Sequence, residues 1–191
     1  NADTVYPVGT TLNPVLTEVD RTANANQESS DAIMDRLGLG VQFTVPGAST
    51  PTNDQPGVAT VDFRPDGPSM SMMNMGALGV ALARSSKGTM TSVAPYVIKG
   101  VPTTVAGGQL GELDAATTAP ILRAMTTVAK TGDASDLTGA PGLKALVGTN
   151  GPQGPGWFLG LQGGKVIVIY TEGNTSGTAA LQVAQKYFRI K

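Results

Sequence analysis

A chain of 191 residues is long enough for one compact domain with a hydrophobic core, and we expect residues 1–191 to form a single domain. Its 13 Lys and Arg residues nearly balance 14 Asp and Glu residues, which excludes the strongly basic surface that holds nucleic acid or an anionic membrane. The absence of Cys and His excludes thiol catalysis, His-assisted triads and the usual zinc sites, so we expect no metal and no cofactor.

The first half of the chain predicts one short helix, a long connection and a buried helix. Apolar residues at helical spacing predict a helix from about Glu28 to Leu37, ending at Gly38. Repeated prolines from Val45 to Pro68 predict an extended connection with at most short strands. From Met70 to Arg84 the residues are apolar nearly all round, which predicts a helix in the core, with its methionines packing rather than binding a ligand.

Between Leu113 and Gly132 the sequence predicts an amphipathic helix. Its apolar residues fall at helical spacing, and Gly132 suits the C-terminal cap. Pro120 lacks an amide hydrogen and is best tolerated in a first helical turn, so we expect the helix to begin close to it.

The C-terminal part predicts a β-hairpin covered by a helix. Two β-rich runs, Trp157–Gln162 and Lys165–Glu172, are joined by Gly163-Gly164, the length of a two-residue hairpin turn. The stretch from Val166 to Tyr170 is apolar on both faces, so we expect a central strand covered on both sides. After a polar turn at Gly173–Gly177, an apolar stripe predicts a final helix over the hairpin. The element order is that of an α+β fold.

Several phrases follow one another in a distinctive order. They are Leu37-Gly38-Leu39-Gly40, Val45-Pro46-Gly47, Ser71–Pro95, Thr117–Lys130, Trp157-Phe158-Leu159-Gly160, Val166–Tyr170 and Glu172–Gly177. This series resembles the transpeptidase domain of class B penicillin-binding proteins. There a strand bearing Lys-Thr-Gly or Lys-Ser-Gly precedes a Trp-Phe-x-Gly strand, a Val- and Ile-rich strand and a Gly-rich turn into the last helix. The resemblance implies an antiparallel sheet flanked by helices, in a β-lactamase/transpeptidase-like fold.

The resemblance also implies three catalytic motifs, and the first is altered here. The stretch from Tyr6 to Pro14 is similar to the family's Tyr-Pro-Pro-Gly-Ser-Thr-Phe-Lys-Pro, in which a Ser-x-x-Lys serine is acylated. Thr10 stands in the place of the serine and Asn13 in the place of the lysine. Asn has no amine that could accept the hydroxyl proton. An ordinary turn or capping hydroxyl is the alternative role for Thr10.

The second and third motifs are altered too. The family's Ser-x-Asn falls by its spacing on Ala25-Asn26-Gln27, where Ala25 lacks the hydroxyl. Its Lys-Thr-Gly falls on Gly148-Thr149-Asn150, where Thr149 could bind a carboxylate but Gly148 supplies no cation. The alternative for Gly148 to Gly154 is a plain connection.

Two further features qualify the match. Only about a dozen residues separate Asn13 from Ala25, where family members insert a helical subdomain, so we expect either a fold lacking most of that subdomain or a coincidental first match. Lys144, Lys165 and Lys186 are the remaining candidates for a displaced base, and lysines in such positions are usually solvated.

Loss at all three motifs favours a pseudoenzyme of peptidoglycan synthesis, a transpeptidase-like domain that binds or scaffolds without acyl transfer. The resemblance implies an extracytoplasmic domain excised from a membrane-anchored protein, with a peptidoglycan stem peptide or cell-wall synthesis proteins as partners. No run reaches the roughly 18 apolar residues that span a bilayer. Two alternatives remain: an active D-alanyl-D-alanine transpeptidase, with Thr10 as nucleophile and Thr149 near the substrate carboxylate, and an unrelated secreted interaction module.

Overall fold

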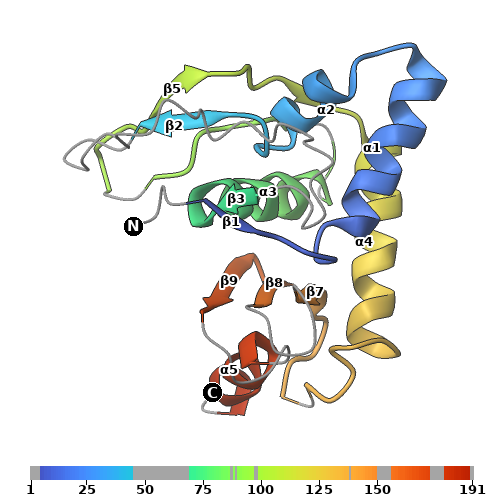
Figure 1. Cartoon of the computed structure of the whole chain (residues 1–191), viewed down its shortest axis with the longest axis vertical. Coiled ribbons are helices and arrows are strands. Elements are labelled where there is room, and N and C mark those ends of the chain that lie inside the picture. The colour runs from blue at the N-terminus through green and yellow to red at the C-terminus, as the bar shows by residue number, and fades with distance from the viewer. Residues whose placement is uncertain are drawn as a thin grey trace.

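The computed structural model describes residues 5–44, 69–86, 88, 90–96, 99–137, 139–149, 156–172 and 179–189 (Figure 1). Two predicted segments, the proline-rich connection of residues 45–68 and the polar turn of residues 173–177, lie outside these ranges. Within the described ranges the chain forms a mixed α+β fold with small antiparallel sheets, which confirms the predicted class.

Five helices are described, and four of them match predicted ones. They are α1 (Asn13–Asn26), α2 (Ser30–Arg36), α3 (Met72–Ser85), α4 (Ala115–Lys130) and α5 (Ala179–Arg189). The sequence interpretation did not include α1 as a helix. It has a proline in its first turn and ends at Asn26, and the left-handed φ of 52° at the following Gln27 brings the Glu28 amide to the Ala23 carbonyl at 3.1 Å. No helix within the described residues is long and apolar enough to cross a membrane.

The described strands form one three-stranded sheet and three short pairs. The main sheet has the order β7 (Lys144–Thr149), β8 (Gly156–Gln162), β9 (Lys165–Thr171), all antiparallel. The short pairs are β1 (Val5–Pro7) with β3 (Ser69–Ser71), β2 (Gln42–Thr44) with β5 (Thr104–Gly107), and β4 (Met90–Thr91) with β6 (Glu112–Leu113). Two of these pairs, β1 with β3 and β2 with β5, join residues that are at least 60 positions apart.

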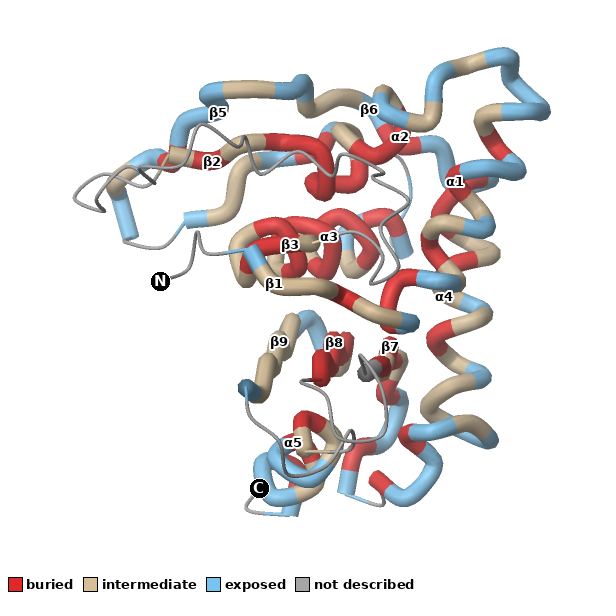
Figure 2. Tube along the Cα trace, viewed as in Figure 1, coloured by how far each residue is buried: buried red, intermediate tan, exposed pale blue. Residues whose placement is uncertain are grey.

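The main sheet separates two hydrophobic clusters, because alternate side chains of a strand point to opposite faces (Figure 2). On one face Leu146, Trp157 and Leu159 join the large core formed with α1, α3 and α4. On the other face Phe158 joins a smaller cluster closed by α5, where it meets Phe188 edge-on with ring centroids 6.5 Å apart. The predicted helix over the hairpin is therefore confirmed.

The predicted hairpin is confirmed, but the expected position of its second strand in the sheet is wrong. Gly163 and Gly164 have φ of 56° and 77°, the left-handed pair that a tight two-residue turn requires. Strand β8, which is buried almost throughout, occupies the centre of the sheet, and β9 lies at its edge. An all-apolar strand indicates that both faces are covered, as they are here by α3 and α5, but it does not tell which neighbours pair along the edges.

The prediction that Pro120 lies in the first turn of its helix is also wrong. Asp114 caps the helix by accepting from the Ala116 amide at 2.9 Å, so α4 begins one turn earlier and Pro120 lies inside it. A proline there leaves the carbonyl of Ala116 without its helical donor. Arg21 of the adjacent α1 donates to that carbonyl at 3.4 Å, so a contact between helices replaces the missing bond.

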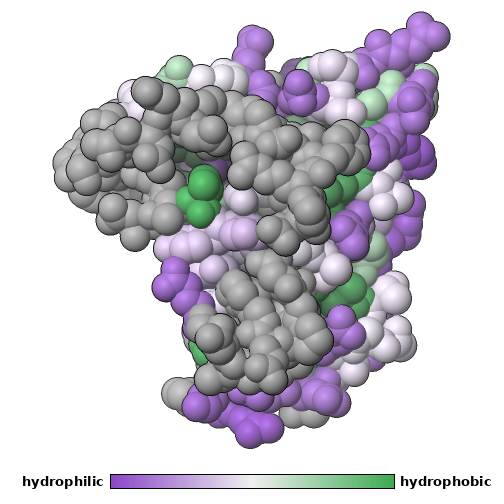
Figure 3. Space-filling model, in the orientation of Figure 1, coloured by the Kyte–Doolittle hydropathy of each residue, from purple (hydrophilic) through white to green (hydrophobic). Residues whose placement is uncertain are grey.

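The methionine-rich helix α3 is a core helix, as predicted. Asn74, which is 2% exposed, donates to the carbonyls of Gly38 and Val41 at 2.9 and 2.8 Å and so fixes α3 to the segment that follows α2. Gly79 lets α3 approach β9 closely, because a Cβ at that position would lie 2.3 Å from Cγ1 of Val166. In contrast to the apolar helix α3, the outer ends of the molecule around α1 and α5 carry mostly hydrophilic side chains on the face that Figure 3 shows.

Candidate functional site

The turn that precedes α1 packs directly against strand β7. In this turn the Thr11 amide donates to the Val8 carbonyl at 3.0 Å and the Asn13 amide donates to the Thr10 carbonyl at 3.1 Å. A Cβ added to Gly148 would lie 2.3 Å from the amide nitrogen of Thr11 and 2.3 Å from its Oγ1. Because real Cβ atoms do not approach backbone so closely, only glycine fits at this point of β7. We call this contact between residues 10–13 and residues 148–149 the corner.

An aromatic cluster fixes the chain just before the corner. Trp157, which pairs with Gly148 across the sheet, donates from Nε1 to the carbonyl of Pro7 at 2.9 Å. Tyr6 stacks on Tyr170 with ring centroids 4.2 Å apart, and Trp157 lies 4.7 Å from Tyr170. Burial of the Tyr170 phenol raises its pKa, with smaller contributions from Glu172 and Tyr6. The cluster therefore positions residues 6–12 against the end of β7 and β8.

Four of the sequence-predicted site residues lie in the two segments that pack together through Thr11 and Gly148. Thr10 lies in the turn and Asn13 is the first residue of α1; both are exposed, whereas Gly148 is buried. Thr149 follows Gly148 in β7, where its backbone pairs with Gly156. Asn150, the third residue of that predicted motif, lies outside the described residues. The alternative of a plain connection is wrong for Gly148 and Thr149, because both belong to a strand.

The predicted counterpart of the second motif does not reach the corner. Ala25 and Gln27 lie at the far end of α1, and both are exposed. At 1.5 Å per residue the helix places Ala25 about 18 Å from Asn13. The residues between Asn13 and Ala25 belong to one continuous helix, α1. No helical subdomain, not even a shortened one, is inserted between these two positions.

The role of Thr10 is that of a turn residue rather than a helix cap. The N-cap position of α1 is Leu12, and no side chain caps this helix. Thr10 contributes its carbonyl to the turn, and its exposed side chain faces away from the core. The alternative of a capping hydroxyl at Thr10 is therefore wrong, and the contribution of Thr10 to the turn comes from its carbonyl.

Thr11, whose hydroxyl is buried at the corner, was not among the site residues predicted from the sequence. Thr11 is 1% exposed, and its Oγ1 has no hydrogen-bond partner among the described residues. A hydroxyl is costly to bury unpaired, so we expect the Thr11 hydroxyl to have a partner in water, in a ligand or in the part of the chain outside the described residues. The signal in the sequence is the phrase Thr11-Leu12-Asn13, a hydroxyl and an amide two residues apart at the start of a helix.

Lys144, Lys165 and Lys186, the three lysines that the sequence offered as a displaced base, do not reach the corner. Lys144 lies in β7 four residues before Gly148, about 13 Å away along an extended strand. Lys165 is exposed beside the hairpin turn, and Lys186 is exposed on α5, on the opposite side of the sheet. None of the three predicted candidates can therefore replace the missing base at the corner.

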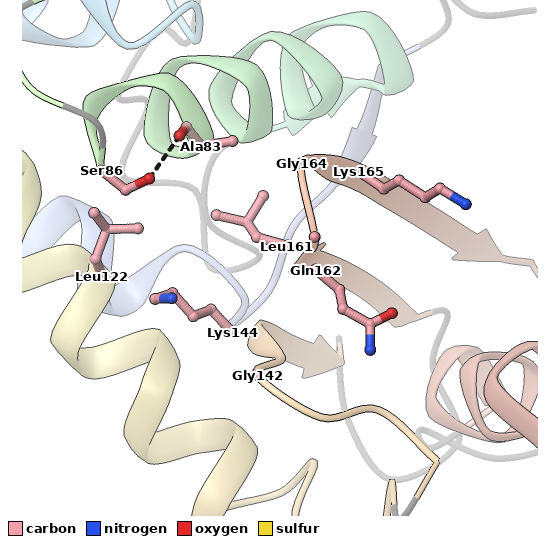
Figure 4. A pocket seen from close by; sticks show the side chains of 10 residues that line it. Ala83, Ser86, Leu122, Gly142, Lys144, Leu161, Gln162, Gly164 and Lys165 are labelled. Atoms are coloured by element: carbon pink, nitrogen blue, oxygen red, sulfur yellow. Dashed lines mark hydrogen bonds between the residues drawn. The ribbon is translucent and has the colours of Figure 1, made fainter.

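Lys144 and Lys165 instead border a small separate cavity of about 110 Å³ at the hairpin end of the sheet (Figure 4). Its apolar wall is formed by Ala83, Leu122 and Leu161. In Figure 4 the Lys144 side chain extends towards Leu122, whereas Lys165 extends away from the cavity. One half-buried ammonium group in a space of this size does not form a recognisable catalytic arrangement.

Two ion pairs occur among the described residues, Glu18 with Arg21 within α1 and Glu28 with Arg36 beside α2. Glu28 and Arg36 form a salt bridge that lowers the pKa of the Glu28 carboxyl. Asp35 accepts from the Gln109 amide at 2.9 Å, but desolvation dominates and raises its pKa. Within the described residues no group of acidic side chains is arranged to hold a metal ion.

Comparison with protein-family models, curated proteins and solved structures found no match. The geometry of the corner therefore carries the functional argument.

Proposed function

We propose that this chain is a transpeptidase-like domain of the penicillin-binding class that binds or scaffolds in peptidoglycan synthesis without acyl transfer. The observation that carries the proposal is the contact of Gly148 with Thr11. It joins the N-terminal phrase and the strand before Trp157, two segments whose counterparts meet at one cleft in that family. The proposed location is extracytoplasmic, in a membrane-anchored protein. The proposed partners are a peptidoglycan stem peptide or the proteins of cell-wall synthesis.

The corner favours a different counterpart for Ser-x-Asn. Thr11-Leu12-Asn13 has a hydroxyl and an amide at the same spacing, and Thr11 lies against β7, whereas Ala25 lies at the far end of α1. In this assignment α1 follows the motif and leads into α2 and the Leu37-Gly38 phrase, as the family order requires. Thr10 then has no catalytic role, and the sequence contains no Ser-x-x-Lys.

The same contact favours a shift of two residues for the third motif. Because a Cβ has no room at position 148, Gly148 is the natural counterpart of the glycine in Lys-Thr-Gly. Leu146 then takes the place of the lysine, on the same face of β7 as Gly148, and is 1% exposed in the large core. The cation that would hold a substrate carboxylate is thus replaced by an apolar side chain.

In neither assignment does a described side chain at the corner have a group that could accept a proton from a hydroxyl. The functional side chains there are the hydroxyls of Thr10 and Thr11 and the amide of Asn13, and an amide has no basic nitrogen. An ordinary threonine hydroxyl needs an adjacent base or a lowered pKa to attack a carbonyl. Binding through hydrogen bonds is the chemistry that remains.

A fluorescent penicillin tests the absence of acyl transfer. We expect no covalent label after prolonged incubation with the folded chain, while an active class B penicillin-binding protein is labelled in parallel. Intact-mass measurement with a second β-lactam should likewise show no adduct. A label that disappears in Thr10→Ala would refute the pseudoenzyme and support the alternative transpeptidase with Thr10 as nucleophile.

A binding experiment separates the scaffold from an unrelated interaction module. We expect a stem-peptide fragment ending in D-alanyl-D-alanine to shift the backbone amide NMR signals of Thr11, Asn13 and Gly148. The variant Gly148→Ala should abolish these shifts. Gly76→Ala is the matched control, because a Cβ at Gly76 on α3 meets no atom within 4 Å. Unchanged spectra at saturating peptide would favour the unrelated module.

A further inference from the structure

The cavity at the hairpin end of the main sheet combines an apolar wall with a cationic side chain (Figure 4). Segments that are distant in the chain form it, namely the end of α3, the middle of α4, the start of β7 and the turn between β8 and β9. The wall consists of Ala83, Leu122 and Leu161, which pack in or against the large core. The cavity measures about 110 Å³ and is partly open to solvent, so a small molecule can enter it.

The ammonium group of Lys144 is the charged group of this cavity. Lys144 begins β7 and is half-buried, and its side chain extends towards Leu122 (Figure 4). The two salt bridges among the described residues both lie within residues 18–36, so Lys144 has no acidic partner in that part of the chain. A cation that is partly removed from water favours an anion beside it.

The carbonyl end of α3 lies at the edge of the cavity, but it does not account for the lysine. The Ser86 hydroxyl donates to the Ala83 carbonyl at 2.7 Å. The Gly88 amide donates to the Ser85 carbonyl at 3.3 Å. Local groups therefore satisfy the last turn of this helix, and the Lys144 ammonium group is not needed as its cap.

The elements around the cavity carry cationic side chains and no acidic ones. The charged residues within α3, α4, β7, β8 and β9 are Arg84, Arg123, Lys130, Lys144 and Lys165. The whole chain has 14 acidic and 13 basic residues, so this distribution does not follow from its composition. Asp133 and Asp136, in the connection from α4 to β7, are exposed and do not line the cavity. An anion that approaches the cavity therefore meets mainly positive charge.

The hairpin turn adds two amide groups to the lining of the cavity. Its ladder pairs Gln162 with Lys165, which leaves the amides of Gly163 and Gly164 outside the bonds between β8 and β9. Successive amides in a turn favour an anion near them. The backbone at this edge therefore suits the same kind of ligand as Lys144.

We propose that this cavity binds a short aliphatic carboxylate, with the carboxylate on the Lys144 ammonium group and the aliphatic chain against Leu122 and Leu161. The volume limits the chain: an apolar cavity of about 150 Å³ holds benzene, so about 110 Å³ holds a smaller group, of about two to four carbons. An apolar wall beside one ammonium group suits a carboxylate better than a phosphate, which binds through several charged donors. The inference does not depend on the proposed function, because no residue of the corner lines this cavity.

Titration of the whole chain with sodium butyrate, followed by amide NMR, tests the site. We expect saturable shifts of the Gly142, Gly163 and Gly164 signals with a Kd of about 1–10 mM, as a ligand of this size allows. Butyramide has the same shape without the charge and should bind at least about tenfold more weakly, since it loses the charged hydrogen bond. Acetate lacks two methylene groups and should also bind at least about tenfold more weakly.

Lys144→Met and Lys165→Met form the matched pair of variants. Both remove one cation and keep a long side chain, but only Lys144 extends along the cavity wall, whereas Lys165 extends away from the cavity (Figure 4). Lys144→Met should weaken butyrate binding at least about tenfold, and Lys165→Met should change it less than about twofold. Near-UV circular dichroism of Trp157 reports that each variant is folded, and the comparison of butyrate with butyramide on the unsubstituted chain needs no variant.

Four results would overturn the proposal. One is the absence of saturable shifts up to about 100 mM butyrate, well above the expected Kd. The second is equal binding of butyramide, which would leave only an apolar contact. The third is an equal loss in Lys144→Met and Lys165→Met, which would indicate general attraction of anions to a positive surface. The fourth is inorganic phosphate that binds as tightly as butyrate, since the apolar wall would then contribute nothing.

Discussion

The contact between Gly148 and Thr11 makes a quantitative prediction about stability. In Gly148→Ala the new methyl carbon would lie 2.3 Å from the Thr11 amide nitrogen, 2.3 Å from its Oγ1 and 2.5 Å from its Cα. Two of these three atoms are backbone, so a change of side-chain rotamer cannot relieve the contact. The turn or the strand must therefore move apart.

Two terms set the expected magnitude. Overpacking of this kind costs about 1–3 kcal/mol, and contacts with backbone place it in the upper part of that range. Moving the turn also loosens the bond from Trp157 to the Pro7 carbonyl, which contributes about 1 kcal/mol. We therefore expect Gly148→Ala to lower the free energy of unfolding by about 2–4 kcal/mol.

Urea unfolding followed by Trp157 fluorescence measures this change, with Gly76→Ala as the control. Gly76 lies inside α3 with space for a methyl group, so that substitution should stabilise the protein by about 0.5–1 kcal/mol. Adding Thr11→Ala to Gly148→Ala should recover only part of the loss, because it removes one of the three close atoms. A loss below about 1 kcal/mol in Gly148→Ala, or full recovery in the double variant, would refute the close backbone packing.

Three further predictions concern groups away from the corner. Asn74→Leu should lower the free energy of unfolding by about 3 kcal/mol in urea titrations, because it leaves two buried carbonyls without their donor. Glu28, whose pKa is lowered by Arg36, contributes stability that is present above its unfolded pKa and is lost as pH falls through the folded pKa. The difference between the unsubstituted chain and Glu28→Gln should therefore shrink in unfolding curves as the pH is lowered, and a constant difference would contradict the salt bridge. Asp35 has the opposite sign, because its raised pKa gives stability that is present below the unfolded pKa and is lost as pH rises through the folded one, so Asp35→Asn should gain on the unsubstituted chain with rising pH.

The elements that the sequence identified are those whose signal is local. The hairpin depends on two adjacent glycines that both adopt positive φ, and the stripe of α5 repeats every three to four residues. Helix α1 carries a local signal as well, since its buried residues Val15, Val19 and Thr22 have helical spacing. That signal was weak because the remaining residues of α1 are mostly polar, and packing against α4 stabilises the helix.

The candidate site was found only in part for a related reason. The phrase around Thr10 and the strand before Trp157 could be singled out as motifs, and they do meet. Local sequence does not show which residues of the two motifs are in contact. Thr11 and Gly148 are far apart in the chain, and they pack together only because Gly148 has no side chain. The assignment of Ala25 to the second motif rested on spacing alone, and a continuous helix carries that residue away from the corner.

The sequence by itself determined the α+β class, the hairpin turn and the helices with a strong apolar stripe, because these follow from backbone preferences and short-range periodicity. The tertiary structure decided the rest. It placed β9 at the edge rather than the centre, since apolar faces do not specify edge partners. It allows Pro120 to lie inside α4, because Arg21 donates to the Ala116 carbonyl that the proline leaves without a helical donor. It also requires a glycine at position 148, because Thr11 packs where a side chain of residue 148 would lie.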